Sequence, residues 1–342
     1  FVCATELAVQ RVNGVDLAQS QLASIAAHAE CYVGVNSGGM DQTASIMGQQ
    51  GSALFIEFHP ELRATPVRFP ETSPSLAFII ANTLVVSDKH VTAPVCYNLR
   101  VVETRVGALI LARHLGVADR PACRDVDPLT FKIVMDEYFA GQSSDAKKGD
   151  EVQVWIDRLS AMIDESKKAL GQHPEGYTRE QMAAALAMTP EELSAKVHEH
   201  QFPVRAERFQ LLNRALHAFS ETLRVVRFRQ ICENPSGDVA EALGSLMNQS
   251  QDSCRDLFEC SCPELDELCA IARKAGSFGS RLTGAGWGGC SVHMVPADKV
   301  EDVKKALAEQ YYAKKHPGLS QKQLDDALFA TAPGRGACYF AL

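Results

Sequence analysis

The stretch Arg281-Leu-Thr-Gly284-Ala-Gly286-Trp-Gly288-Gly289-Cys290 places four glycines within six residues and sets a tryptophan among them. The spacing Gly284-x-Gly286-x-x-Gly289 formally matches the dinucleotide-binding fingerprint. That fingerprint must open a helix, whereas the residues that follow, 291–295, alternate like a strand. The stretch therefore predicts either a glycine-rich hairpin turn or a loop that a ligand or a second loop approaches closely, because glycine lacks the Cβ atom that would prevent such an approach.

Outward from this loop, the second half of the chain combines helical and strand patterns. Two capping boxes, Thr178-Arg-Glu-Gln181 and Thr189-Pro-Glu-Glu192, predict the starts of two helices. Apolar periodicity predicts further helices and strands. The helices are expected at residues 205–232, 239–258, 263–275, 300–315 and 321–329, and the strands at 280–283, 290–295 and 336–342. This half is expected to be α+β.

The first half reads as a mixed α/β domain. Helices are expected at residues 2–12, 17–33, 41–48 and 98–115, and strands at 53–58, 66–69 and 76–86. The composition loosens at 116–124, and 145–151 is a charged connector. Since 342 residues suggest two domains at about 150 residues each, we expect domains at 1–115 and 116–342, the second with a helical insertion.

Composition excludes several classes of protein. The 34 Lys and Arg residues against 42 Asp and Glu residues give a formal charge of −8, which offers no general footprint for nucleic acid or an anionic membrane. Hydrophobic residues at 46% are ordinary for a globular protein and argue against disorder. The longest apolar run, 76–86, is interrupted by Asn82 and Thr83 and falls short of the roughly 20 residues that span a bilayer.

The eleven cysteines are odd in number and spread through apolar segments, which predicts reduced core thiols of an intracellular, cytoplasmic protein rather than a disulfide framework. Cys260-Ser-Cys262, with Cys254 and Cys269 nearby, raises the question of zinc. The spacing lacks a second close pair or an H-x-x-x-H partner, so no metal-binding residues are predicted.

Asp41 follows Gly38-Gly39-Met40 at the predicted start of a helix. A first-turn carboxylate is commonly stabilised by the helix dipole, by roughly 0.3–1 kcal/mol. The functional alternative is a carboxylate held beside a hydroxyl that must lose its proton, as phosphoryl transfer requires. Spacing alone leaves both interpretations open.

Four segments taken together resemble the eukaryotic, fungal-type galactokinases, a family of the GHMP kinase superfamily. They are 34–42 (Gly-Val-Asn-Ser-Gly-Gly-Met-Asp-Gln), 92–103 (Thr-Ala-Pro-Val-Cys-Tyr-Asn-Leu-Arg-Val-Val-Glu), 257–265 (Leu-Phe-Glu-Cys-Ser-Cys-Pro-Glu-Leu) and 280–290. The resemblance covers essentially the whole chain. It implies the GHMP kinase fold, with the remainder of an N-terminal ribosomal-S5-like α/β domain followed by a ferredoxin-like, helix-rich C-terminal domain.

The resemblance also implies an activity, the transfer of the ATP γ-phosphoryl group to the C1 hydroxyl of α-D-galactose with Mg²⁺. In that family pattern Asp41 matches the catalytic carboxylate, which also contacts the sugar. Gly38 matches a residue lining the sugar pocket, and Tyr97 matches the tyrosine that hydrogen-bonds the sugar.

The same comparison implies a nucleotide site. Ser87, Asp88 and Lys89 fall at the segment that borders the nucleotide in members of the family, although by themselves they read as a polar turn that closes a strand. Gly284 and Gly286 belong to the loop resembling the superfamily's third motif, which packs against the ATP phosphate loop.

The start of the chain departs from the family pattern. Phe1-Val-Cys-Ala4 is already helical in pattern, without an initiator methionine, an N-cap or a signal peptide. It resembles the body of the helix that follows the family's Gly-Leu-Ser-Ser-Ser phosphate loop. We therefore expect a fragment that lacks this loop and the sugar-signature loop, and that is not catalytically competent alone.

Two other functions share most of these motifs. One is a non-catalytic transducer that senses galactose and ATP and binds a transcriptional repressor; such relatives differ in the upstream phosphate loop. The other is an N-acetylgalactosamine kinase, whose relatives tend to carry Phe where Tyr97 stands. Tyr97 therefore favours galactose, and a galactokinase is the preferred hypothesis.

Overall fold

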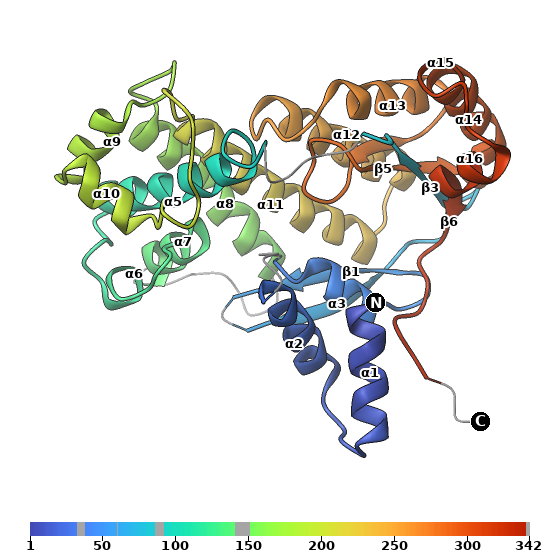
Figure 1. The fold of residues 1–342 in the computed structure, drawn as a ribbon, viewed down its shortest axis with the longest axis horizontal. Coiled ribbons are helices and arrows are strands. Elements are labelled where there is room, and N and C mark those ends of the chain that lie inside the picture. Colours follow the sequence, from blue (N-terminus) through green and yellow to red (C-terminus); the bar gives the residue numbers. More distant parts are fainter. Residues whose placement is uncertain (33–37, 60, 86–91, 141–150, 340–342) are drawn as a thin grey trace. The chain divides into compact units, whose positions relative to one another are not determined.

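The computed structural model describes residues 1–32, 38–59, 61–85, 92–140 and 151–339 (Figure 1). The chain forms two compact units, each assembled from separate stretches of sequence. Unit 1 comprises Phe1–Ala77, Arg229–Val239 and Thr331–Leu342, and unit 2 comprises Phe78–Phe228 and Ala240–Ala330. The domain boundary expected after residue 115 stays a prediction.

The N-terminal part of unit 1 combines helices with an antiparallel hairpin. The elements are α1 (Val2–Val12), α2 (Gln19–Cys31), α3 (Met40–Met47), β1 (Ser52–Glu57) and β2 (Arg63–Arg68). The strands pair antiparallel, with Ser52 opposite Arg68 and Glu57 opposite Arg63. The helices bury Cys3, Leu22 and Ile46 in one apolar cluster, as their helical spacing predicts.

The C-terminal segment of unit 1 differs from the sequence-based expectation. A closing strand was expected at 336–342, but the structure shows no regular secondary structure over 332–339, and 340–342 lie outside the described residues. The backbone N–H groups of Gly336 and Ala337 donate to the carbonyls of Gly48 and Ser45, at 2.7 and 2.6 Å. This segment therefore binds carbonyls at the end of α3, which have no intrahelical partner, instead of a neighbouring strand.

Unit 2 is rich in helices, and both predicted capping boxes are present. The Thr178 and Thr189 side chains accept from the N–H groups of Gln181 and Glu192 at the starts of α9 and α10. The helices are α5 (Tyr97–His114), α6 (Pro121–Arg124), α7 (Phe131–Ala140), α8 (Glu151–Leu170), α9 (Arg179–Leu186), α10 (Pro190–Lys196), α11 (Leu211–Glu233, which continues into unit 1), α12 (Val239–Asp256) and α13 (Pro263–Lys274).

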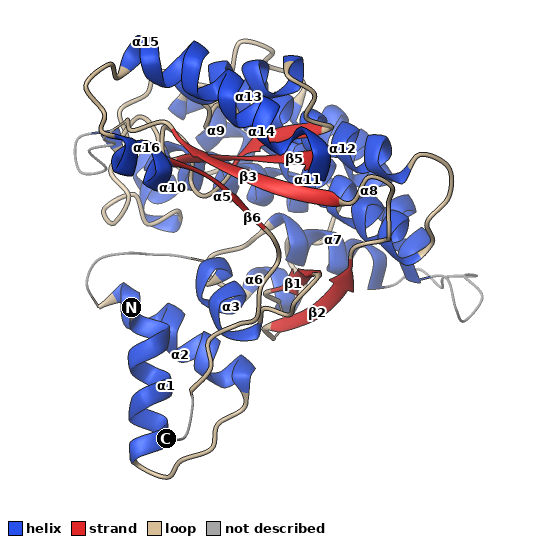
Figure 2. Ribbon diagram, turned by 90° about the vertical axis from the view of Figure 1, so that its right-hand side faces the viewer, coloured by secondary structure: helices blue, strands red, loops and turns tan. Residues whose placement is uncertain are grey.

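A four-stranded sheet carries the glycine-rich stretch. Its strand order is β4 (Gly279–Leu282), β5 (Cys290–Pro296), β3 (Leu76–Asn82) and β6 (Leu328–Thr331), of which Figure 2 labels β5, β3 and β6. Strands β4 and β5 pair antiparallel, with Leu282 opposite Ser291, and α13 packs on both. The predicted hairpin around the glycine-rich stretch is therefore confirmed.

The helical segment after β5 holds the end of β3. The segment predicted at 300–315 consists of α14 (Val300–Leu307), a π-helical turn (Ala308–Tyr312) and α15 (Ala313–Lys315), and α16 (Gln321–Ala327) follows. Tyr311 and Tyr312, both buried, donate their hydroxyls to the carbonyls of Thr83 and Asn82, at 2.8 and 2.6 Å. In the described part of the chain, no helix has the length and apolar character needed to cross a membrane.

Candidate functional site

The glycine loop, residues 284–289, lies between β4 and β5 and is approached closely by a second loop. The N–H of Thr283 donates to the carbonyl of Cys290 at 2.9 Å and closes the hairpin. Gly286 has a φ of +87°, and a Cβ atom there would lie 2.0 Å from the carbonyl oxygen of Cys260. Only glycine allows this approach without displacement of the neighbouring backbone. Both predicted features, a hairpin turn and a close approach, therefore occur in the same loop.

The second loop connects α12 with α13, and we call it the cysteine loop, residues 257–262. Trp287 joins it to the glycine loop by two hydrogen bonds. Its backbone N–H donates to the carbonyl of Cys260 at 2.7 Å, and its indole Nε1 donates to the carbonyl of Glu259 at 3.0 Å. These bonds account for a tryptophan in a turn of glycines, because its indole is anchored to a second element instead of lying free on the surface.

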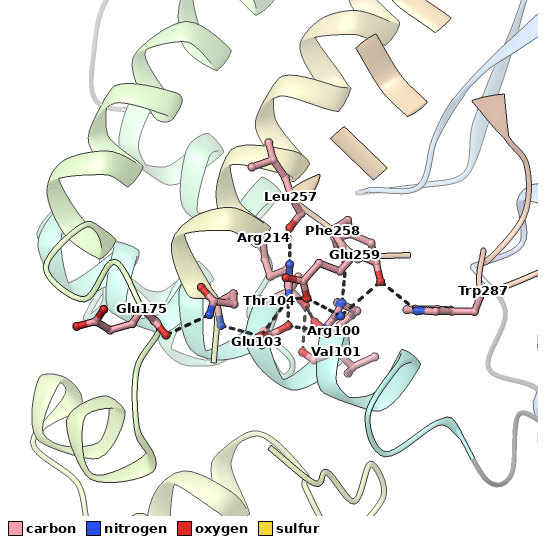
Figure 3. A network of polar contacts seen from close by, with 11 residues as sticks. Arg100, Val101, Glu103, Thr104, Glu175, Arg214, Leu257, Phe258, Glu259 and Trp287 are labelled. Carbon is pink, nitrogen blue, oxygen red and sulfur yellow. Dashed lines mark hydrogen bonds and ion pairs between the residues drawn. The ribbon is translucent and has the colours of Figure 1, made fainter. Parts of the chain in front are cut away.

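Arg100, on α5, holds the cysteine loop from its other side (Figure 3). Its Nε donates to the carbonyl of Phe258 at 2.6 Å, and its two terminal nitrogens donate to the carboxylates of Glu259 and Glu103, each at 2.9 Å. Arg100 is only 6% exposed, and burial is the largest cause of the lowered pKa of its guanidinium. Two carboxylate partners compensate its charge.

Arg214, on α11, completes this network. It is fully buried and donates to Glu103 at 2.6 Å, to Glu259 at 2.8 Å and to the carbonyl of Leu257. The second oxygen of Glu103 accepts the N–H of Gln210 at 2.7 Å. Two arginines thus face two glutamates, and helices α5 and α11 are tied to the cysteine loop, as Figure 3 shows. Breaking such a buried pair leaves an uncompensated charge, so the network fixes the loop firmly.

A pocket of about 320 Å³ opens within unit 2 beside the glycine loop. Its lining includes Tyr97, the first residue of α5, together with Gly284 and Trp287 of the glycine loop. The structure therefore brings together two residues that the sequence assigned to different ligands, Tyr97 to the sugar and Gly284 to the nucleotide. The Tyr97 side chain is partly open to solvent, since the residue is 41% exposed.

The polar groups in this pocket are already paired. His217 lies 2.9 Å from the Ser253 hydroxyl and stacks on Phe258, and burial lowers the pKa of its imidazole to about 4, so the ring is neutral near pH 7. For Glu221, burial acts to raise the pKa, but Arg281 and other donors outweigh it, and the pKa of that carboxyl is lowered overall. The pocket is therefore lined by a neutral ring and a compensated ion pair.

Sequence reasoning did not single out His217, Glu221, Arg100 or Arg281 as site residues. A signal existed for the first two, because they lie four residues apart within a predicted helix and hence share one face. Nothing in the local sequence indicated that this face meets the glycine loop.

Asp41 and Gly38 lie in unit 1. Asp41 is exposed in the first turn of α3, as predicted, and α3 begins after Gly39, whose carbonyl accepts the N–H and the hydroxyl of Thr43 at 2.9 and 2.7 Å. Gly38 precedes this turn and is exposed. Ser87, Asp88 and Lys89 lie outside the described residues. The catalytic and binding roles of these residues stay predictions.

The chemistry of the described residues bears on a metal and on a nucleotide. Within the described residues, no group of three His, Cys, Asp or Glu side chains lies together as a metal site requires. Mg²⁺ is usually held through substrate phosphates and one or two carboxylates. At Gly284 the space around the absent Cβ atom is open, so a phosphate could approach its backbone, whereas at Gly286 the cysteine loop occupies that space.

Comparisons with known proteins agree on one family. Residues 1–49 match the family described as GHMP kinases N terminal domain, and residues 238–313 match GHMP kinases C terminal. The galactokinase of Saccharomyces cerevisiae is 40% identical and that of Candida parapsilosis 39% identical, each over 100% of this chain and 67% of its own length. The chain thus spans about two thirds of these relatives. The crystal structure of Lactococcus lactis galactokinase complexed with galactose aligns with a TM-score of 0.60 at 20% identity, covering 98% of this chain and 64% of that one, which shows a shared fold.

Proposed function

This chain belongs to the galactokinase family, and from that premise we propose that the full-length protein transfers the γ-phosphoryl group of ATP to the C1 hydroxyl of α-D-galactose. The observation that carries the proposal is the 40% identity to a galactokinase over 100% of the chain. The close packing of the glycine loop on the cysteine loop and the position of Asp41 in the first turn of α3 support it.

Asp41 is proposed as the base that accepts the proton of the sugar hydroxyl. Phosphoryl transfer depends mainly on positioning and on charge stabilisation, and one carboxylate that receives the nucleophile's proton completes the site. Asp41 is exposed in the first turn of α3, which leaves its carboxylate accessible to a substrate.

Gly38 and Tyr97 are proposed to bind the sugar. A glycine at position 38 leaves room for a ring to approach the backbone, since among the described residues, its chain neighbours aside, no atom lies within 4 Å of the place a Cβ would take. Tyr97 lines the pocket in unit 2, and its phenolic hydroxyl is proposed to hydrogen-bond the sugar. Its presence in place of Phe favours galactose over N-acetylgalactosamine.

ATP is the phosphoryl donor that the family implies, and Ser87, Asp88, Lys89, Gly284 and Gly286 are proposed to border it. Gly284 would do so through its open backbone, and Gly286 indirectly, by holding the glycine loop against the cysteine loop. Mg²⁺, when bound with ATP, would neutralise charge on the phosphates. A repressor-type protein partner and a cytoplasmic location stay predictions.

The test is an assay of the full-length protein with ATP, Mg²⁺ and galactose that follows formation of galactose 1-phosphate. Asp41→Asn keeps the shape of the side chain but removes the base, and turnover is expected to fall by about 10²-fold or more. Glu180→Gln, which neutralises another exposed first-turn acid in α9, serves as the matched control and is expected to leave turnover near that of the wild type. Near-normal turnover by Asp41→Asn would remove the base assignment, and an inactive wild-type protein would favour the non-catalytic transducer.

A further inference from the structure

Cys254 and Cys260 lie close together where α12 ends and the cysteine loop begins. Cys254 lies in the last turn of α12, which ends at Asp256, and the N–H of Cys260 donates to the carbonyl of Cys254 at 2.9 Å. Glu259, just before it, has a φ of +52°. The two residues also belong to one buried cluster, so the turn brings their side chains close together, which is the first requirement for a disulfide.

The two thiols are buried but reachable by a small molecule. Each cysteine is 4% exposed and packs in one cluster with Leu265 and Leu282. Both also line the pocket of about 320 Å³ beside Trp287. Hydrogen peroxide is a small molecule, and a space of this size is large enough to admit it.

The surroundings favour Cys254 as the reactive thiol. The Cys260 thiol acts as a donor toward the sulfur of Cys254, and this is the largest cause of the lowered pKa of Cys254; the charge of Arg281 acts in the same direction. The same interaction raises the pKa of Cys260. Burial raises the pKa of the neighbouring Cys262 thiol, so that residue is a less favourable nucleophile.

We propose that Cys254 and Cys260 are a redox-active dithiol that closes to a disulfide on reaction with a hydroperoxide. The Cys254 thiol releases its proton, and the resulting thiolate attacks one oxygen of the peroxide. The O–O bond breaks, and with hydrogen peroxide the leaving hydroxide takes up that proton as one water, while a sulfenic acid remains on Cys254. Cys260 then attacks this sulfur, the S–O bond breaks, and the hydroxide leaves as a second water with the proton from Cys260. Two thiols are oxidised and one peroxide is reduced. An added dithiol reverses the reaction by exchange.

Closing this bond would move the glycine loop. A disulfide requires the sulfurs to approach to about 2.05 Å, which is far closer than two thiols in contact. The helix holds Cys254, so the displacement falls on Cys260 in the cysteine loop. Its carbonyl accepts the Trp287 N–H and faces Gly286 at the closest approach in the loop, and neither contact can shift alone. Insofar as the proposed kinase function holds, oxidation would therefore weaken phosphoryl transfer.

The chemical test is oxidation of the full-length protein with hydrogen peroxide, followed by alkylation, tryptic digestion and mass spectrometry without reductant. Cleavage at Arg229, Arg255 and Arg273 places Cys254 and Cys260 in separate peptides, 230–255 and 256–273. A bond between these peptides, mapped by fragmentation to Cys254 and Cys260 and removed by dithiothreitol, is expected. It should persist in Cys262→Ser and be lost in Cys260→Ser. No bridge, or a bridge to Cys262, Cys269 or Cys232, would overturn the proposal.

Two further measurements test the consequence. Hydrogen exchange of a peptide covering residues 284–289 is expected to rise on oxidation of the wild type and of Cys262→Ser, and to be unchanged in Cys260→Ser. Galactose phosphorylation is expected to fall about tenfold or more in the same two proteins, since a displacement of about 1 Å in a catalytic site can cost a hundredfold. A disulfide without altered exchange would refute the coupling to the glycine loop. A reduced wild type that does not phosphorylate galactose would refute the proposed function, while the mass and exchange measurements would still decide on the dithiol.

Discussion

Replacing Gly286 by Ala tests whether the glycine loop depends on its contact with the cysteine loop. Two effects are expected. A non-glycine residue at a φ of +87° costs about 1–2 kcal/mol in backbone strain. In addition, the new Cβ would lie 2.0 Å from the Cys260 carbonyl oxygen, which is backbone and cannot rotate away.

The clash between the new Cβ and the Cys260 carbonyl oxygen must push the glycine loop and the cysteine loop apart. That displacement would break or lengthen the two hydrogen bonds that Trp287 donates to the carbonyls of Cys260 and Glu259. Each such bond contributes about 0.5–1.5 kcal/mol to stability. The total destabilisation expected for Gly286→Ala is therefore about 2–5 kcal/mol. Gly284→Ala is the matched control, because its φ of +79° is similar but nothing lies within 4 Å of the new Cβ. It should cost only the strain of about 1–2 kcal/mol.

The assay is urea unfolding of the full-length protein, followed by circular dichroism and tryptophan fluorescence, with both variants measured against the wild type. The free energy of unfolding should fall by about 1–3 kcal/mol more for Gly286→Ala than for Gly284→Ala, which is the part due to the lost Trp287 bonds. Equal losses for the two variants would show that the approach of Cys260 carries no energy, and the description of the site as two mutually supporting loops would have to be abandoned.

Three other predictions concern unit 2. Glu103→Gln should destabilise the protein by about 3–5 kcal/mol, because two buried arginines lose a charged partner, and a loss below about 1 kcal/mol in urea unfolding would contradict the network. Burial lowers the pKa of His217 from 6.5 to about 4, so as the pH falls this imidazole binds its proton in the unfolded state before it does so in the folded state. The free energy of unfolding should therefore decline by about 3 kcal/mol between pH 6.5 and pH 4 because of this residue. Thermal unfolding at a series of pH values should show that His217→Gln removes this part of the decline. Tyr97→Phe should weaken galactose binding by about 1 kcal/mol in calorimetry, and unchanged affinity would place its hydroxyl outside the sugar site.

The local sequence was sufficient to predict most of the secondary structure. Polar residues of the right type at helix starts, such as Thr178 and Thr189, specify their caps within four residues of chain, and both capping boxes form as predicted. The glycine-rich stretch predicted a hairpin with a close approach, because glycine, which has no Cβ atom, is favoured in tight turns and where another backbone comes near. The four motifs likewise identified the family without any knowledge of contacts.

The failure at 336–342 shows where local pattern stops being sufficient. The residues there could extend as a strand, and pairing with another strand would be one way to satisfy their backbone. The tertiary structure offers a different partner, the free carbonyls of Ser45 and Gly48 at the end of α3, which lie almost 300 residues away in sequence. Periodicity indicates which face of a segment is apolar, but it contains no information on which backbone group will be near.

The sequence by itself determined the elements, the glycine loop and the family. Only the tertiary structure decided that Cys260 is the neighbour of Gly286, that Arg100 reaches Phe258 and Glu259 across more than 150 residues, and that Tyr97 and Gly284 share a pocket. The physical reason is the distance along the chain over which each interaction acts. Helix propensity, capping and turn geometry act over a few neighbouring residues, whereas a buried arginine finds its carboxylate only after several helices have packed together.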